Sequence, residues 1–143
     1  MTNPTKILVP FDGSANAERA LNHTIALAKS MQSYEIHLLN VQPSVGGGVS
    51  VFVGKGDIEN WHREEGEKAL ASGKRLLDAA GLTYKTHIGV GIPGDVIAAY
   101  AKKFDCGQII MGTRGHGSAL GLLLGSVAQH VTSHAQVPVT LIK

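Results

Sequence analysis

The chain has 143 residues, a formal net charge of +2 and 43% hydrophobic residues, which is typical of one globular domain and not of a disordered chain. Its charged residues form no long run of one sign, so the basic stripe of a nucleic-acid binder is missing from the sequence. The single cysteine, Cys106, excludes an internal disulfide, and no apolar stretch reaches the roughly 20 residues that span a bilayer. The first residues lack the layout of a signal peptide. We therefore expect one cytoplasmic domain over residues 1–143 that binds neither nucleic acid nor membrane.

Five short apolar runs recur along the chain, separated by segments of helical spacing. The first is almost continuously apolar, as in a strand that is covered on both faces. The last contains a proline but is otherwise rich in β-branched residues, which favour strands. The predicted strands are Lys6–Phe11, Glu35–Val41, Leu82–Val90, Gly107–Met111 and Val137–Ile142.

Polar residues and glycines mark the ends of the predicted helices. Ser14 is placed to cap the first helix, and Asp57 to cap a long helix over Ile58–Ala80, with Gly81 just past its end. A third helix begins at Pro93, a residue favoured in the first helical turn. Ser126–His134 is predicted to be the last helix.

The alternation of strands and helices predicts an α/β fold with a doubly wound parallel sheet and helices on both faces. In such sheets ligands bind beyond the carboxyl ends of the strands, at the point where the strand order switches direction. Three strand ends are therefore candidate ligand sites: Pro10–Ser14, Val41–Pro43 and Met111–Ser126.

The segment GTRGHGSALGLLLGS, from Gly112 to Ser126, holds five glycines between the fourth strand and the last helix. Glycines let the main chain approach an anion, and a helix N-terminus supplies N–H donors and the positive end of a dipole. Arg114 and His116 can add charge or hydrogen bonds, and the Ser126 hydroxyl can donate to a phosphate oxygen. The segment predicts phosphate binding, against the alternative of a plain connection that ends in a helix cap. It is not a Walker A loop, because Gly125 stands where that loop has lysine.

Gly89–Gly94 also matches a glycine pattern, the G-x-G-x-x-G of dinucleotide-binding folds. It follows the third predicted strand instead of the first, and the acidic residue that should follow about 20 positions later is absent. Pro93 would also remove an N–H donor from the helix start. We interpret the segment as a tight turn before a helix.

Other polar residues leave alternatives open. Asp12, at the end of the first strand, can either contact a ligand or metal, or form an Asx turn with its own main chain. His130 and His134 share one helix face, but a third metal ligand is missing nearby, which favours solvated surface histidines. Cys106 precedes a buried strand and is predicted to be a small packing residue.

The spacing Gly112-x2-Gly115-x9-Gly125-Ser126 resembles the G-2x-G-9x-G-(S/T) signature of the nucleotide-binding branch of the universal stress protein family. The resemblance extends over essentially the whole chain, from the opening ILVPFDGS through IIMGTRGHG and LLLGSVAQHV to the closing VPVTLIK. It implies a five-stranded parallel sheet in the order 3-2-1-4-5, a Rossmann-like fold of the adenine nucleotide alpha hydrolase type. It also implies binding of ATP, or of AMP or ADP, with Mg²⁺ or Mn²⁺ as an accompanying ion.

The same resemblance assigns roles to individual residues. The base and ribose would lie against Pro10, Asp12 and Val41, with Met111 and Gly112 under the ribose and phosphates. Backbone N–H groups and one hydroxyl would hold the phosphates, contributed by Gly115, Gly125, Ser126 and Val127. Phe11 stands where the family commonly has a smaller aliphatic residue, and it would narrow the pocket if its ring pointed inward. With Arg114 and His116 added for their position, the candidate nucleotide-binding residues are Pro10, Asp12, Val41, Met111, Gly112, Arg114, Gly115, His116, Gly125, Ser126 and Val127.

The functional expectation is an ATP-binding module that acts as a nucleotide-dependent switch in stress signalling, with nucleotide ordering the loops Gly112–Gly125 and Gly46–Gly56. The resemblance further implies a homodimer that pairs the last strand, Val137–Ile142, and this would cover an apolar edge. Two alternatives use the same fold: a slow ATPase, and a dimeric interaction scaffold without nucleotide. No catalytic base and no P-loop lysine are evident, so we expect weak hydrolysis at most.

Overall fold

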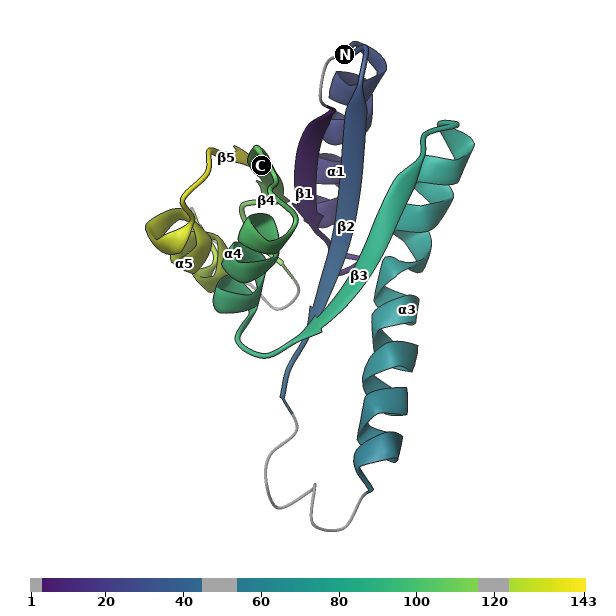
Figure 1. The fold of residues 1–143 in the computed structure, drawn as a ribbon, viewed down its shortest axis with the longest axis vertical. Coiled ribbons are helices and arrows are strands. Elements are labelled where there is room, and N and C mark those ends of the chain that lie inside the picture. Colours follow the sequence, from purple (N-terminus) through teal and green to yellow (C-terminus); the bar gives the residue numbers. More distant parts are fainter. Residues whose placement is uncertain (1–3, 45–53, 116–123) are drawn as a thin grey trace.

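A computed structural model describes residues 4–44, 54–115 and 124–143. Strands and helices alternate along the described chain (Figure 1). The strands are β1 (Thr5–Pro10), β2 (Tyr34–Gln42), β3 (Tyr84–Val90), β4 (Gln108–Gly112) and β5 (Val139–Ile142). The helices are α1 (Ala15–Lys29), α3 (Lys55–Ala79), α4 (Pro93–Lys103) and α5 (Ser126–His134).

The strands form one parallel sheet in the order β3-β2-β1-β4-β5, which confirms the predicted fold class and topology. Ile7 in β1 aligns with Ile36 of β2 on one side and with Gln108 of β4 on the other. The chain thus proceeds outward from β1 in one direction and then returns to build the other half. The switch in strand order lies between β1 and β4, where a ligand site is expected.

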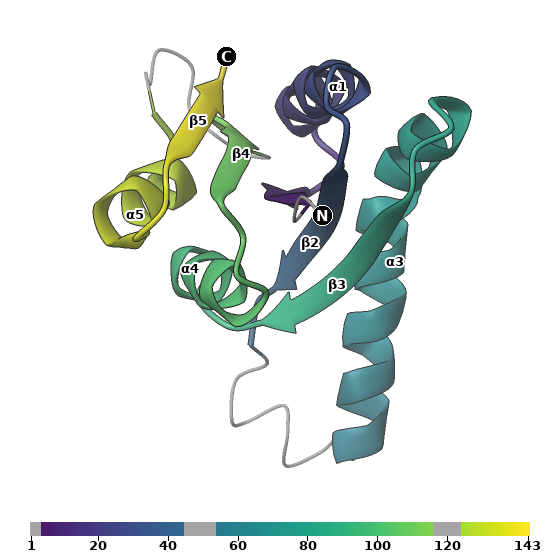
Figure 2. The same cartoon turned by 45° about the horizontal axis from the view of Figure 1, so that its top comes forward.

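Helices α1 and α3 cover one face of the sheet, called here the α1/α3 face, and α4 and α5 cover the other, the α4/α5 face (Figure 2). The α1/α3 face has a core of buried aliphatic side chains, among them Leu21, Leu70 and Leu77. The N-terminal part of α3 extends past the sheet. There, Nε2 of His62 lies 2.9 Å from the carbonyl oxygen of Pro43 and ties the helix to the chain that leaves β2.

Two glycines of α3 let this helix approach the sheet closely. A Cβ added to Gly66 would lie 2.7 Å from a carbon of Ile88, and one added to Gly73 would lie 2.9 Å from Leu38 and 3.1 Å from the ring of Phe11. Such distances leave no room for a methyl group without a shift of the neighbours. The helix therefore tolerates the lower helix propensity of glycine at these points in exchange for close packing.

The α4/α5 face is more mixed in polarity. Its core includes Leu8, Ile97, Ile109 and Val131, together with Cys106, which is 3% exposed. This confirms the cysteine as a packing residue, and burial raises the pKa of its thiol to about 11.

Two histidines from neighbouring strands, His37 and His87, lie on the α4/α5 face beneath the ring of Phe104. His37 is fully buried, with Nδ1 2.8 Å from Nε2 of His87 and Nε2 2.9 Å from the carboxylate of Glu35, which also pairs with Lys85. The carboxylate accepts, so the Nε2–H of His37 donates to it, and Nδ1 accepts from His87. Burial lowers the pKa of both imidazoles, partly offset for His37 by Glu35.

Helix ends agree with most of the sequence signals. Ser14 caps α1, its hydroxyl accepting the N–H of Ala17 at 3.1 Å, and Gly81 follows α3 with φ +71°. The predicted cap at Asp57 is wrong. The helix begins earlier, at Lys55, with Gly54 as its N-cap, so Asp57 lies in its first turn. A carboxylate there still stabilises the helix, because it lies near the positive end of the helix dipole.

The second glycine pattern is a turn, as interpreted from the sequence. Gly91 has φ +143°, Ile92 is the N-cap of α4, and Pro93 occupies its first turn. A Cβ on Gly89 would lie 2.6 Å from Val96, so this glycine serves the packing of the helix on the strand.

The prediction of solvated histidines near the end of the chain is only partly correct. His134 is exposed, but His130 is half-buried, stacks on His134 and lies 2.7 Å from a carboxylate oxygen of Asp95. Its ring occupies the space beside Gly94, where an added Cβ would approach to 2.2 Å. His130 therefore helps to join α5 to α4.

Strand boundaries agree with the predicted ones to within two residues, and the largest differences are at the starts of β3 and of the closing strand. The closing strand begins at Val139 and not at Val137, although the carbonyl of Pro138 accepts the N–H of Ile109 at 2.9 Å. Pro138 itself has no N–H to extend the ladder.

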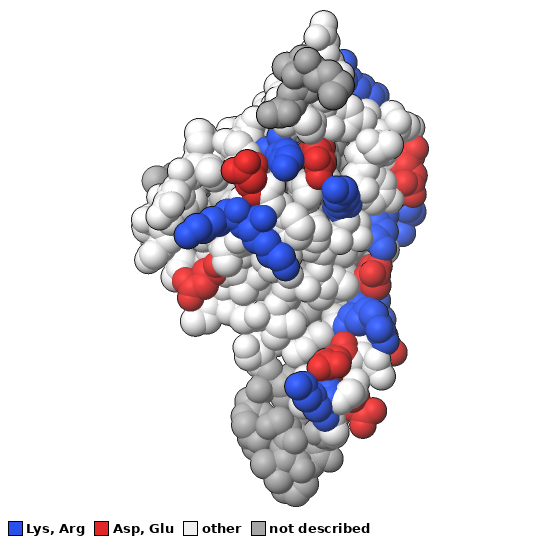
Figure 3. Space-filling view, viewed as in Figure 1, with Lys and Arg blue, Asp and Glu red and all other residues white. Residues whose placement is uncertain are grey.

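No helix within the described residues combines the length and the apolar character needed to cross a membrane. On the face shown in Figure 3, lysines and arginines are interspersed with aspartates and glutamates over the helices and strands.

Candidate functional site

A cavity of about 600 Å³ opens at the carboxyl ends of β1, β2 and β4, on the side of α4 and α5. It lies at the switch in strand order, between the chain that leaves β1 and the start of α5. Strand order and helix placement thus bring together three segments that are far apart in the sequence: the turn after β1, the end of β2, and both sides of the glycine segment.

The structure places ten of the eleven candidate residues in the wall of this cavity. The eleventh, His116, lies in 116–123, outside the described residues, as does most of the Gly46–Gly56 loop. The candidate residues that line the cavity are Pro10, Asp12, Val41, Met111, Gly112, Arg114, Gly115, Gly125, Ser126 and Val127.

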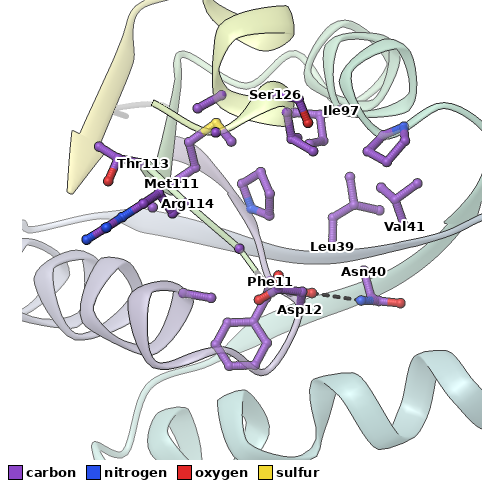
Figure 4. A pocket seen from close by; sticks show the side chains of 18 of the residues that line it. Phe11, Asp12, Leu39, Asn40, Val41, Ile97, Met111, Thr113, Arg114 and Ser126 are labelled. Carbon is purple, nitrogen blue, oxygen red and sulfur yellow. Dashed lines mark hydrogen bonds between the residues drawn. The ribbon is translucent and has the colours of Figure 1, made fainter. Parts of the chain in front are cut away.

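One half of the cavity is built from apolar side chains. Leu39 and Val41 come from β2, Ile97 from α4 and Met111 from β4, and Figure 4 shows Val41 and Leu39 at the end of the cavity opposite Arg114. Prolines 43 and 93 extend this wall. An apolar group bound against these side chains would be removed from water.

The other half of the cavity is polar and is formed largely by main chain. It contains residues 112–115 and 125–127, with Asp12 across from them. A Cβ on Gly115 would lie 2.7 Å from Oδ2 of Asp12, so the glycine allows the carboxylate and the loop to approach closely. The other carboxylate oxygen of Asp12 accepts the N–H of Ser14 at 2.9 Å, which is the predicted Asx turn. Both sequence interpretations of Asp12 are thus compatible, since an oxygen in a turn can also line a cavity.

The start of α5 offers its N–H groups to this half of the cavity. The expectation that Gly125 presents its own N–H to a ligand is wrong, because that group donates to the carbonyl of Thr113 at 2.6 Å. Ser126 and Val127 follow, in the first turn, where a helix leaves N–H groups without intrahelical acceptors. No side chain of the described residues makes a capping hydrogen bond there.

Phe11 does not narrow the cavity. Its ring is 3% exposed and packs in the core of the α1/α3 face, beside Gly73 of α3 (Figure 4). The larger side chain is accommodated beside Gly73, which has no side chain of its own, although Phe11 remains among the residues that line the cavity.

Two buried asparagines at this edge were missed by the sequence analysis. Asn40 donates from Nδ2 to the carbonyl of Phe11 at 2.8 Å and fixes the turn after β1. Asn16, in the first turn of α1, accepts the N–H of Arg114 at 2.7 Å through Oδ1. For Asn40 the available signal was a carboxamide inside a run of buried strand positions, since buried polar groups need hydrogen-bond partners.

Comparisons with known proteins agree with this architecture. The model of the universal stress protein family matches residues 4–143. Universal stress protein MJ0531 of Methanocaldococcus jannaschii is 34% identical over 146 residues, covering 96% of this chain and 81% of that protein.

Solved structures give the same result. The structure of MJ0577 from M. jannaschii superposes with a TM-score of 0.84 at 34% identity, over 97% of this chain and 95% of that one. The universal stress protein from Archaeoglobus fulgidus in complex with dAMP has a TM-score of 0.68 at 25% identity, with all of both chains covered. Because the family model spans nearly the whole sequence and a relative at 34% identity covers 96% of it, this chain belongs to the universal stress protein family.

Proposed function

We propose that the cavity binds an adenine nucleotide, with the base in its apolar half and the phosphates in its polar half. The observation that carries the proposal is the unequal construction of one cavity, apolar side chains at one end and main chain with a helix N-terminus at the other. The complex of the A. fulgidus relative with dAMP supports the choice of an adenine nucleotide.

Individual roles follow from position. Pro10 and Val41 flank the base, and the carboxylate of Asp12 accepts a hydrogen bond from a ribose hydroxyl. The phosphates meet the main chain around Gly115 and the N–H groups of Ser126 and Val127, where the helix dipole favours negative charge. Arg114, the one cationic residue among the described residues of the wall, adds charge at this end.

ATP is the proposed physiological ligand, with Mg²⁺ or Mn²⁺ held chiefly by the phosphates. The residues fit such an ion, because Mg²⁺ commonly binds one protein carboxylate together with substrate phosphates, and Asp12 is the one carboxylate in the described wall. We further propose that the bound and free forms are read by protein partners as a switch in stress signalling. That role requires nucleotide to bind one state of the protein more tightly than another.

The proposed assembly is a homodimer through Val137–Ile142. Within the described sheet β5 is the edge strand, and its residues are half-buried in the single chain. Pairing with a second copy would satisfy its outer main-chain groups. Sedimentation equilibrium at several concentrations tests this, and a monomer throughout would contradict it.

Titration calorimetry with adenosine, AMP and ATP, each with and without Mg²⁺, tests the nucleotide site. Gly115→Ala should weaken AMP binding about tenfold, because the new methyl group displaces the Asp12 carboxylate, at a cost of about 1.4 kcal/mol. Gly107→Ala is the matched control, since its added Cβ would approach other atoms only to 3.8 Å. Absence of binding by the unmodified protein at millimolar nucleotide would refute the function, whereas equal affinities for all three proteins would refute only the role of Gly115.

A further inference from the structure

Asn16 joins three segments at the polar end of the cavity. It is 7% exposed, in the first turn of α1. Its Oδ1 accepts the N–H of Arg114 at 2.7 Å, and its Nδ2 donates to the carbonyl of Ile142, the last residue of β5, at 2.9 Å. The oxygen of this carboxamide is therefore hydrogen-bonded to the chain that leaves β4, and its nitrogen is hydrogen-bonded to the closing strand.

Gly112 is shaped to this carboxamide. A Cβ on Gly112 would lie 2.6 Å from Oδ1 of Asn16 and 2.7 Å from its Cγ. The space that a side chain would fill at the first glycine of the motif is thus occupied by Asn16. The absence of a side chain at position 112 is therefore explained by contact with Asn16. The sequence alone had instead suggested the close approach of an anion to the glycines of this segment.

We propose that Asn16 is a positioning residue that sets the main chain of residues 112–115 for the nucleotide phosphates and ties that turn to the end of β5. The inference rests on the proposed function for its ligand. The amide plane fixes the direction of the Arg114 N–H, and so the orientation of the peptide groups on either side of it.

A hydrogen bond near Asn16 also joins the ends of the neighbouring strands β4 and β5. The carbonyl of Ile142 accepts a second hydrogen bond, at 2.9 Å, from the N–H of Thr113. The start of α1 also holds Asp12 through its Asx turn with Ser14. One helix start therefore positions the carboxylate on one side of the polar half and the glycine turn on the other.

The first experiment separates positioning from general stability. Asn16→Asp keeps an acceptor for Arg114 but turns a carboxylate toward the Ile142 carbonyl, so the turn should shift. We expect AMP to bind at least tenfold more weakly and adenosine to bind within twofold of the unmodified protein, because only the phosphate side moves. Thr24→Val, which removes a fully buried hydroxyl from the same helix away from the cavity, is the control and should leave both affinities unchanged. Equal losses for adenosine and AMP, or no loss for AMP, would overturn the proposal.

The second experiment needs no nucleotide and so distinguishes failure of this inference from failure of the proposed function. Gly112→Ala is made in the unmodified protein and in an Asn16→Ala background, and the denaturant midpoint is measured for all four proteins. If the carboxamide occupies the space beside Gly112, the shift caused by Gly112→Ala should fall to less than half in the Asn16→Ala background. Additive shifts would overturn the inference even if the protein binds AMP, while a reduced shift in a protein that binds no AMP would leave the positioning of the turn standing and the function refuted.

Discussion

The two faces of the sheet are packed differently, although the same strands contribute to both. On the α1/α3 face, α3 approaches the strands at Gly66 and Gly73, and the core is aliphatic apart from Phe11 and partly buried tyrosines. The α4/α5 face contains a histidine pair, of which His37 is buried and His87 half-buried, and, at the carboxyl edge, the cavity. A close-packed apolar layer does not respond to pH and has no room for a ligand. Buried titratable groups and an open cavity lower the stability of the other face, but they allow it to respond to pH and to bind a ligand.

Substitution of two adjacent leucines of β2 should have the largest effect on stability among the tests of this comparison. Leu38 and Leu39 are both fully buried, on opposite faces, and Leu39 lines the cavity. Replacing either with alanine should lower the free energy of unfolding by about 2–5 kcal/mol. Only Leu39→Ala should also weaken AMP binding. Denaturant unfolding and calorimetry measure the two effects, and equal effects of both variants on AMP affinity would show that the faces do not divide the tasks.

Helix α3 allows a second test with a glycine control. Gly66→Ala should destabilise the protein by about 1–3 kcal/mol, because the methyl group would overlap Ile88. Gly56→Ala, in the same helix but with nothing within 4 Å of the added Cβ, should stabilise it by up to about 1 kcal/mol through helix propensity. Denaturant midpoints give both values. A gain in stability from Gly66→Ala would contradict the tight packing of this face.

The histidine pair should make the α4/α5 face sensitive to acid. Burial keeps the pKa of His37 and His87 below the ordinary value of 6.5, so the unfolded chain takes up protons first as the pH falls. The associated stability is fully present above about pH 6.5 and is lost as the pH falls toward the lowered pKa values.

Unfolding curves between pH 8 and pH 5 measure this dependence. His87→Gln, whose amide can still donate to His37, should reduce the slope of the unfolding free energy against pH. His23→Gln, at an exposed position, is the control and should leave this slope unchanged. If the slope stays the same in His87→Gln, the pair is not its source.

Ser126 provides the smallest expected change. Ser126→Ala removes one hydroxyl at the start of α5 and should raise the AMP dissociation constant about two- to tenfold, for a loss of about 0.5–1.5 kcal/mol. The helix should keep its stability, because Gly125 and not Ser126 is its N-cap. Ser133→Ala, near the other end of the helix, is the control. If the Ser126→Ala variant binds AMP with unchanged affinity, the hydroxyl contributes nothing and only the N–H groups of this helix take part in binding.

Features of the fold that depend on local sequence could be predicted. Ser14 as a cap, Gly81 after α3 and Pro93 at the start of α4 follow from the conformations and hydrogen bonds of single residues. Resemblance to the family supplied the strand order, which local patterns do not contain. The spacing of the glycines and Ser126 pointed to the part of the cavity wall formed by residues 112–115 and 125–126.

Features that depend on contacts across the sheet could not be predicted. Asn16 meets Ile142 across 126 positions of sequence and Arg114 across 98, and neither distance leaves a periodic signal. The same holds for the pairing of His37 with His87. The sequence leaves the direction of the Phe11 ring open for the same reason, because the space that receives it lies beside Gly73 on a different helix.

The hydrogen bond between the Gly125 N–H and the Thr113 carbonyl, 2.6 Å long, has a consequence for the sequence that lies between these two residues. It fastens the two ends of the intervening sequence to each other, so a change in the length of that sequence need not separate the end of β4 from the start of α5. The entropy of closing a connection grows slowly, by about 0.6 kcal/mol for each doubling of its length. The end of β4 and the start of α5 can therefore keep their relative positions when the sequence between Thr113 and Gly125 changes.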